Sequence, residues 1–98
     1  MKKILILGAG KIGRMAAVML NESGDYAVTL ADANGEMLEF CAQDHAATLI
    51  KVDVTDEAAL TDVATGHDAI LSTCPFYLNV AIARVARAVG ASYFDVTE

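Results

Sequence analysis

Three glycines near the amino terminus have the types and spacing of a phosphate-binding turn. They stand in the segment Gly8-Ala9-Gly10-Lys11-Ile12-Gly13, directly after the apolar run Lys2–Leu7. A G-x-G-x-x-G turn between a strand and a helix can bind a pyrophosphate, because the helix start offers free N–H groups and the positive end of the helix dipole. Gly8 would make the tight turn, Gly10 would admit the phosphates and Gly13 would let the helix pack closely. We therefore predict that Gly8, Ala9, Gly10, Lys11, Ile12 and Gly13 bind a dinucleotide.

One acid completes this pattern. Asp32 ends the second apolar run, Tyr26–Ala31, close to the roughly 20 residues beyond the glycines at which a ribose-binding carboxylate is expected. A carboxylate there accepts hydrogen bonds from both ribose hydroxyls and repels a 2′-phosphate. We therefore predict NAD as the cofactor, with NADP disfavoured. The competing interpretation is that the glycines form only a tight turn and Asp32 only ends a strand.

Two further segments follow predicted strands and could contact the cofactor. Asp53 could accept from the adenine amino group and Val54 could pack on the ring, or Asp53 could be a turn residue before a cap at Thr55. The segment Ser72-Thr73-Cys74-Pro75 should meet the pyrophosphate and the nicotinamide ribose through its backbone. Cys74 has no histidine near it in sequence, so we expect a small buried loop residue and no nucleophile.

Other polar and aromatic residues receive less specific interpretations. Phe76 and Tyr77 could line a substrate mouth or cover the core, and we expect mixed burial without chemistry. We expect His45 to be solvated. Thr97 and Glu98 should lie beside the nicotinamide, either near a substrate amine or as a chain end. The pattern predicts no metal site, and it identifies no catalytic residue.

Strands and helices alternate along the whole sequence. Each helix has a start or stop signal: one runs from Lys11 to a stop at Gly24, one is capped by Asn34, one is capped by Thr55 and one ends at Gly90. The first helix carries an apolar face made of Ile12, Met15, Ala16, Met19 and Leu20. The predicted strands are Lys2–Leu7, Tyr26–Ala31, Thr48–Val52, Asp68–Ser72 and Ser92–Val96.

This alternation predicts a doubly wound parallel α/β sheet with helices on both faces. Right-handed crossovers give the strand order 3-2-1-4-5. Ligands bind outside the carboxyl ends of the strands at the switch point, here between the first and fourth strands. The glycine turn and the residues singled out above would surround that crevice.

Composition narrows the class of protein. Residues 1–98 make one small domain, with a net charge of −6 that argues against nucleic acid as a partner. Cys41 and Cys74 give neither a disulfide framework nor metal-ligand spacing, and no membrane span or signal peptide is evident, so we expect a reduced, cytoplasmic protein. Since a complete dehydrogenase would need a substrate domain, we interpret the chain as the amino-terminal part of a longer enzyme, with a small free-standing nucleotide-binding protein as the alternative.

With the glycine turn at residues 8–13 included, the chain resembles the saccharopine dehydrogenase family over all of its 98 residues. The resemblance rests on the segment Ser72-Thr73-Cys74-Pro75-Phe76-Tyr77-Leu78-Asn79-Val80 and on the ending Ala86-Arg87-Ala88-Val89-Gly90-Ala91-Ser92-Tyr93-Phe94-Asp95-Val96-Thr97-Glu98. It implies a Rossmann-like NAD(P)-binding domain of an oxidoreductase that moves a hydride between nicotinamide and the imine or secondary amine joining two amino-acid halves. The resemblance implies a substrate with several carboxylates, whereas the Lys and Arg residues of this chain are scattered. We therefore expect a second domain to bind the substrate, and this segment alone to bind cofactor without turnover. We also expect that the protein could form a homo-oligomer.

Two other functions share part of the pattern. Nucleotide-sensing domains of potassium-uptake systems have the same opening, and Asp53-Val54-Thr55-Asp56 resembles one of their segments. The stretch Pro75-Phe76-Tyr77 and the ending from Tyr93 speak against this regulatory alternative. A fold that has lost its ligand is disfavoured, since the three glycines and Asp32 are intact.

Overall fold

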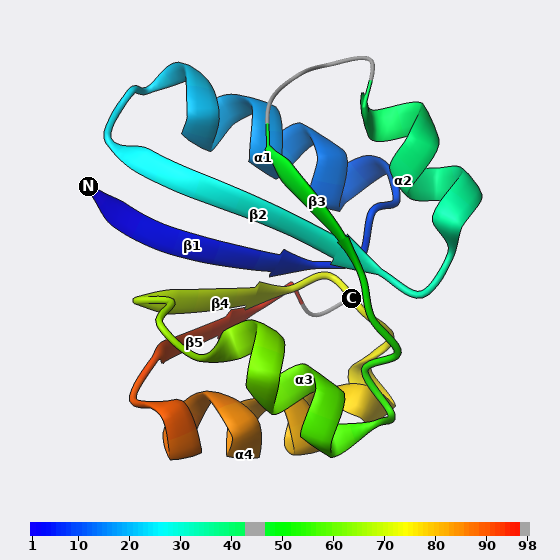
Figure 1. Cartoon of the computed structure of the whole chain (residues 1–98), viewed down its shortest axis with the longest axis vertical. Coiled ribbons are helices and arrows are strands. Elements are labelled where there is room, and N and C mark those ends of the chain that lie inside the picture. The colour runs from blue at the N-terminus through cyan, green and yellow to red at the C-terminus, as the bar shows by residue number, and fades with distance from the viewer. Residues whose placement is uncertain (43–46, 97–98) are drawn as a thin grey trace.

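A computed structural model describes residues 1–42 and 47–96, and in these the chain forms a five-stranded parallel sheet (Figure 1). The strand order is β3-β2-β1-β4-β5, as predicted, with β1 in the centre paired to β2 and β4. The predictions for His45, Thr97 and Glu98 fall outside the described residues.

The elements follow the predicted alternation closely. The strands are β1 (Lys2–Leu7), β2 (Tyr26–Asp32), β3 (Thr48–Lys51), β4 (Ala69–Ser72) and β5 (Ser92–Asp95). The helices are α1 (Lys11–Glu22), α2 (Gly35–Cys41), α3 (Glu57–Ala64), α4 (Asn79–Val89) and the short 3-10 helix η2 (Phe76–Leu78).

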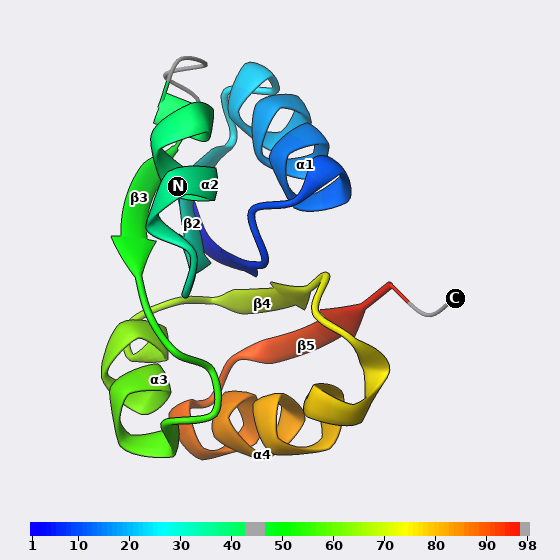
Figure 2. The same cartoon turned by 90° about the vertical axis from the view of Figure 1, so that its right-hand side faces the viewer.

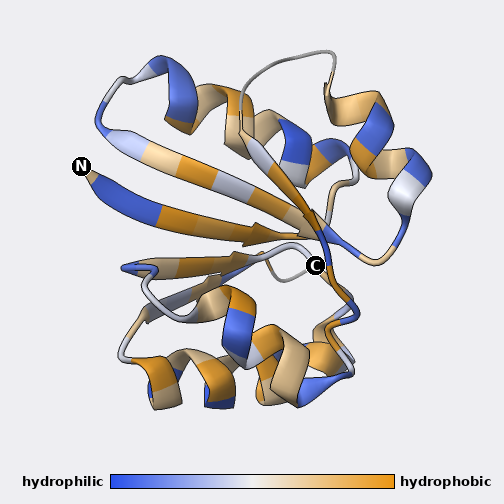
Figure 3. Cartoon of the chain, in the orientation of Figure 1, coloured by the Kyte–Doolittle hydropathy of each residue, from blue (hydrophilic) through white to orange (hydrophobic). Residues whose placement is uncertain are grey.

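Helices cover both faces of the sheet, as Figures 1 and 2 show. Helices α1 and α2 lie on one face, and α3 and α4 lie on the other. Each face has its own core, built around Ile6 and Leu30 beneath α1 and α2, and around Leu5, Leu7 and Ile70 beneath α3 and α4. Apolar residues therefore fill the central strands with little alternation, as Figure 3 shows and as a sheet buried on both sides requires.

Helix starts agree with the sequence, with one correction. The side chain of Asn34 accepts hydrogen bonds from the N–H groups of Glu36 and Met37, which confirms the predicted cap of α2. The predicted cap at Thr55 is wrong, because Asp56 caps α3 by accepting from the N–H of Ala59 at 3.1 Å. The Thr55 hydroxyl is already used: it donates to Asp53 at 2.6 Å.

The predicted apolar face of α1 is only partly buried. Ala16 and Leu20 pack against the core, but Ile12, Met15 and Met19 are 46%, 55% and 65% exposed. Helix α1 sits mainly on β2, and the β4–β5 half of that face has no helix among the described residues (Figure 2). Helical periodicity identified the apolar stripe but could not say how much of it the chain itself covers.

The helices of the described residues include none with the length and hydropathy to cross a bilayer. In the same residues, His, Cys, Asp and Glu form no group of three that could hold a metal ion.

A Gly13→Ala substitution should destabilise the fold. A Cβ at Gly13 would overlap the carbonyl oxygen of Gly8, so α1 would have to move away from the sheet. We expect the free energy of unfolding to fall by about 1–3 kcal/mol, the usual cost of overpacking, in urea denaturation.

Gly35→Ala is the matched control for this measurement. Gly35 also lies in the first turn of a helix, but a Cβ there meets no atom within 4 Å. Its stability should be unchanged or slightly higher. Equal losses in the two variants would contradict the close packing assigned to Gly13.

Candidate functional site

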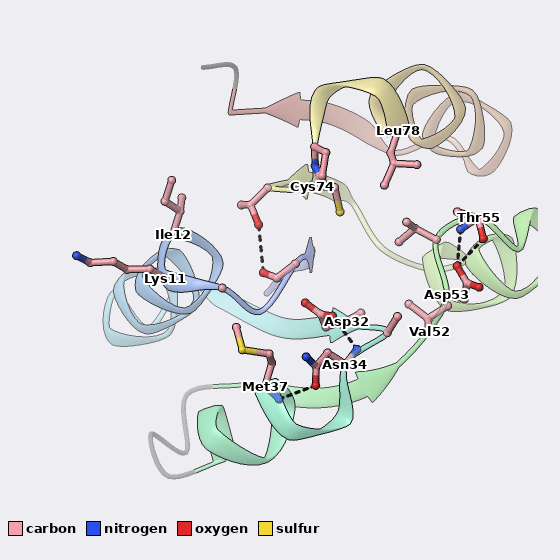
Figure 4. A pocket seen from close by; sticks show the side chains of 17 residues that line it. Lys11, Ile12, Asp32, Asn34, Met37, Val52, Asp53, Thr55, Cys74 and Leu78 are labelled. Atoms are coloured by element: carbon pink, nitrogen blue, oxygen red, sulfur yellow. Dashed lines mark hydrogen bonds between the residues drawn. The ribbon is translucent and has the colours of Figure 1, made fainter.

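A pocket of about 670 Å³ opens at the carboxyl edge of the sheet (Figure 4). It is built by the segments that follow the first four strands, and it lies at the predicted switch point between β1 and β4. The lining residues are Gly8, Gly10, Lys11, Ile12, Ala31, Asp32, Ala33, Asn34, Met37, Val52, Asp53, Val54, Thr55, Thr73, Cys74, Pro75 and Leu78. The fold therefore brings together the four segments that the sequence singled out.

The glycine turn leaves β1 in a conformation that few other residues adopt. Gly8 has a φ of 102°, and its N–H donates to the carbonyl of Ala31 at 2.8 Å. A Cβ on Gly8 would collide with the side-chain oxygen of Thr73, and one on Gly13 would collide with the Gly8 carbonyl. Two of the three glycines are thus required by contacts within the protein.

Gly10 is required by neither backbone strain nor packing. It precedes α1 with a φ of −72°, and a Cβ there would meet no atom within 4 Å. Because Gly10 lines the pocket, a side chain at this position would project into open space that a ligand can use. This is the arrangement expected of a glycine that lets a phosphate approach the backbone.

The amino terminus of α1 is suited to an anion. It has no side-chain cap and no acid in its first turn, whereas α2 and α3 have capping side chains and the acids Glu36 and Glu57. Its first N–H groups therefore have no acceptor from the helix itself, and the dipole favours negative charge beside them. The Lys11 side chain extends away from the other labelled residues in Figure 4, so Lys11 offers its backbone to the pocket.

Asp32 lies at the end of β2 and links two turns. Its Oδ2 accepts from the N–H of Ala9 at 2.6 Å, and its Oδ1 accepts from the N–H of Asn34 at 2.8 Å. A carboxylate oxygen has two lone pairs, so each oxygen can still accept from a ribose hydroxyl. Asp32 lines the pocket, but Ala9 is buried and already donates its N–H to Asp32. Ala9 does not line this pocket, and its N–H is directed to Asp32, so its predicted contact with a ligand stays a prediction.

Asp53 and Val54 lie at the end of the pocket next to α3. Oδ1 of Asp53 accepts from both the hydroxyl and the N–H of Thr55, and these hydrogen bonds lower the pKa of the exposed carboxyl. Both bonds use Oδ1, so Oδ2 is the oxygen that could accept from an adenine amino group. Val52 and Val54 supply apolar walls beside it.

The loop after β4 forms the opposite wall. Thr73, Cys74 and Pro75 line the pocket, and the Cys74 sulfur points into it in Figure 4. Cys74 is half-buried, and this burial raises the pKa of its thiol. Cys74 is therefore a neutral wall of the pocket at physiological pH.

Ser72 differs from the other residues of this loop. It is fully buried and does not line the pocket. Its hydroxyl donates to Oδ1 of Asn79 at 2.8 Å and accepts from the N–H of Cys74 at 3.3 Å, so it fixes the loop to the start of α4. The neighbouring Tyr93 is half-buried. Its loss of solvation is the main cause, and the nearby Asp95 the second, that raises the pKa of the Tyr93 hydroxyl to about 12.

Several lining residues were not predicted as site residues. Asn34 is predicted only as a helix cap, and the sequence analysis gives no functional role to Met37 or Leu78. The others are Ala31, Ala33, Val52 and Thr55. All of them lie at a strand end or within the first turn after one, so the rule that ligands bind at the carboxyl edge could have found them.

A smaller cavity adjoins the first one beyond the β4 loop. It measures about 400 Å³ and is lined by Ile12, Thr73, Cys74, Pro75, Phe76 and Val96. Phe76 and Tyr77 stand 76% and 70% exposed beside each other, so the prediction of mixed burial for this pair is wrong.

Comparison with solved structures shows the same fold in several proteins. Apo saccharopine dehydrogenase (L-Glu forming) from Saccharomyces cerevisiae matches 100% of the chain at 23% identity, with a TM-score of 0.91. A Rossmann-fold NAD(P)-binding family protein from Shigella flexneri matches 95% at 22% identity, with a TM-score of 0.76. A variant of uronate dehydrogenase from Agrobacterium tumefaciens complexed with NAD matches 99% at 20% identity, with a TM-score of 0.72.

The chain spans 22%, 50% and 41% of these three proteins, respectively. No curated protein sequence matches it.

The family itself is defined by a sequence model. The model described as saccharopine dehydrogenase NADP binding domain matches residues 4–98, nearly the whole chain. The potassium-uptake alternative gains no support from these matches. The glycine turn, the uncapped α1 terminus and the open pocket fit the dinucleotide that this family binds. The chain therefore belongs to the saccharopine dehydrogenase NADP-binding domain family and is a Rossmann-fold domain that binds NAD(P).

Proposed function

We propose that this chain is the NAD-binding domain of an oxidoreductase that acts on a secondary amine or imine joining two amino-acid halves. The observation that carries the cofactor choice is Asp32 at the end of β2, with both carboxylate oxygens oriented by backbone N–H groups. When bound, the nicotinamide would supply or accept the hydride. This chain's own residues bind and orient the cofactor.

Asp32 supports NAD over NADP for an electrostatic reason. A 2′-phosphate would bring further negative charge next to the carboxylate. Two like unit charges a few ångströms apart repel each other by about 1 kcal/mol or more. Asp32 cannot readily turn away, since it would give up its bonds to Ala9 and Asn34. The name of the matching family says NADP, so this preference is a specific property that we propose for this chain.

Each part of the dinucleotide can be matched to a separate part of the pocket. The pyrophosphate would lie against Gly10 and the N–H groups of Lys11 and Ile12. The adenine would lie between Val52 and Val54, with Asp53 accepting from its amino group. The nicotinamide half would pass the loop of Thr73, Cys74 and Pro75 toward the smaller cavity.

Substrate binding and proton transfer would belong to another part of a longer protein. The chain spans 22% of the yeast saccharopine dehydrogenase, and its site offers no cluster of arginines or lysines for a substrate with several carboxylates. We propose that residues 1–98 alone bind cofactor without turnover and act in the reduced cytoplasm.

Calorimetric titration with NAD and NADP tests the cofactor choice. NAD should bind at least about tenfold more tightly, since about 1.4 kcal/mol of repulsion corresponds to a factor of ten. Asp32→Asn should weaken binding of both dinucleotides, because its amide places an NH₂ donor where one of the two carboxylate oxygens accepts from Ala9 or Asn34. It should also narrow the ratio between the two affinities. Equal affinities in the unsubstituted protein would refute the role given to Asp32.

Gly10→Val should abolish NAD binding and leave the fold intact. The valine side chain would occupy the open space beside the α1 terminus where the pyrophosphate would lie, and its Cβ would meet no protein atom within 4 Å. Loss of a glycine before a helix costs about 1 kcal/mol or less, so the urea midpoint should move little. Unchanged NAD affinity would contradict the placement of the phosphates.

Alkylation of Cys74 reports whether a ligand occupies the pocket. Its raised pKa means that less thiolate is present near neutral pH, so iodoacetamide should react slowly and faster as the pH rises. Saturating NAD should slow the reaction further because the thiol lines the pocket. Cys41 is buried and should remain unmodified, and its labelling before Cys74 in mass spectrometry would argue against this geometry.

A further inference from the structure

The Thr73 hydroxyl occupies the space that two glycines leave open. A Cβ on Gly8 would collide with Oγ1 of Thr73, and a Cβ on Gly13 would come within 3.1 Å of the same atom. The end of β4 thus touches both the turn after β1 and the first turn of α1. One side chain meets the two backbone segments that form the phosphate site.

The same hydroxyl binds the turn through its carbonyl groups. It donates to the carbonyl of Leu7 at 2.9 Å and to that of Gly8 at 3.1 Å, one hydrogen being shared between two acceptors. The backbone N–H of Thr73 also donates to Leu7, at 2.9 Å. These bonds fix the direction of the Gly8 carbonyl, against which Gly13 packs.

The opposite side of the turn is fixed from β2 and α2. Ala31 accepts from the N–H of Gly8, Asp32 accepts from the N–H of Ala9, and the Cys41 thiol contacts the Ala9 carbonyl at 3.6 Å. Every backbone polar group of Gly8 and Ala9 therefore has a partner in the protein. The groups left to meet phosphate are the N–H groups at the start of α1, whose position depends on this turn.

We propose that Thr73 is a positioning residue for pyrophosphate binding, which acts by fixing the Gly8 carbonyl and so the aim of the α1 amino terminus. The inference rests on the proposed function, because it concerns the same dinucleotide site. It gives the Thr73 side chain a role beyond the backbone contact expected from the sequence. An N–H group moved by a few tenths of an ångström gives a longer and weaker bond to a phosphate oxygen.

Substitutions at Thr73 separate the effect of its hydroxyl on NAD binding from the effect of its side-chain volume. Thr73→Val removes the donor at nearly constant shape, Thr73→Ala removes it without adding a carbon near Gly8, and Thr73→Ser keeps it. Thr61→Val is the matched control, since the Thr61 hydroxyl donates to the carbonyl of Glu57 at 2.7 Å on α3, outside the pocket.

The experiment measures NAD affinity by calorimetry and the phosphorus NMR signals of NAD bound at saturation. Thr73→Val and Thr73→Ala should lower NAD affinity about tenfold, the upper range for one hydrogen bond, and should shift the bound pyrophosphate signals. Thr73→Ser and Thr61→Val should stay within twofold of the unsubstituted protein and keep its signals. Urea unfolding of each variant measures its stability, so that a loss of affinity caused by unfolding can be recognised.

The outcomes distinguish this inference from the proposed function. If the unsubstituted protein does not bind NAD, the proposed function fails. If it binds and both Thr73→Ala and Thr73→Val retain its affinity and phosphorus signals, the positioning role is overturned. A loss of affinity with unshifted signals, or an equal loss in Thr73→Ser, would also overturn it, because neither depends on where the hydroxyl directs the turn.

Discussion

The contact between the Gly8 carbonyl and Gly13 is the constraint on which the rest of the site depends. It brings the start of α1 against the end of β1, closer than any residue with a Cβ allows. Once α1 begins there, its unpaired N–H groups face the space between β1 and β4, and its far end must lie over β2. The position of the proposed phosphate site and the packing of the first helix therefore follow from one contact.

Most of the fold could be predicted because local and global signals agree. Apolar strands buried on both faces, helix stops at Gly24 and Gly90 and the cap at Asn34 all lead to the same alternation, and right-handed crossovers then fix the strand order. The error at α3 arose because Thr55 and Asp56 are adjacent, and both residue types commonly cap helices. Sequence could not show that Asp53 already engages the Thr55 hydroxyl, which leaves the cap to Asp56.

The site was less predictable where neighbouring residues point in different directions. Ser72 and Thr73 are adjacent at a strand end, yet one is fully buried and bonded to Asn79 and the other lines the pocket. Side chains alternate between the two faces of a strand, and a four-residue segment gives too little pattern to assign them. The exposure of Ile12 and Met19 likewise depends on what lies across the sheet from α1, which helical periodicity does not encode.

Local arrangement outweighs the net charge of −6 in binding an anionic dinucleotide. Charges farther than about 8 Å away are largely screened at physiological ionic strength, so distant acids have little effect on the pyrophosphate. At the proposed phosphate site, α1 presents N–H groups with neither a capping side chain nor an acid, while side chains of Asn34 and Asp56 cap α2 and α3. Asp32, the acid nearest this turn, directs its two oxygens to Ala9 and Asn34. In the function that we propose, its charge acts at the ribose and favours NAD over NADP, and its bond to Ala9 helps to hold the turn that precedes α1.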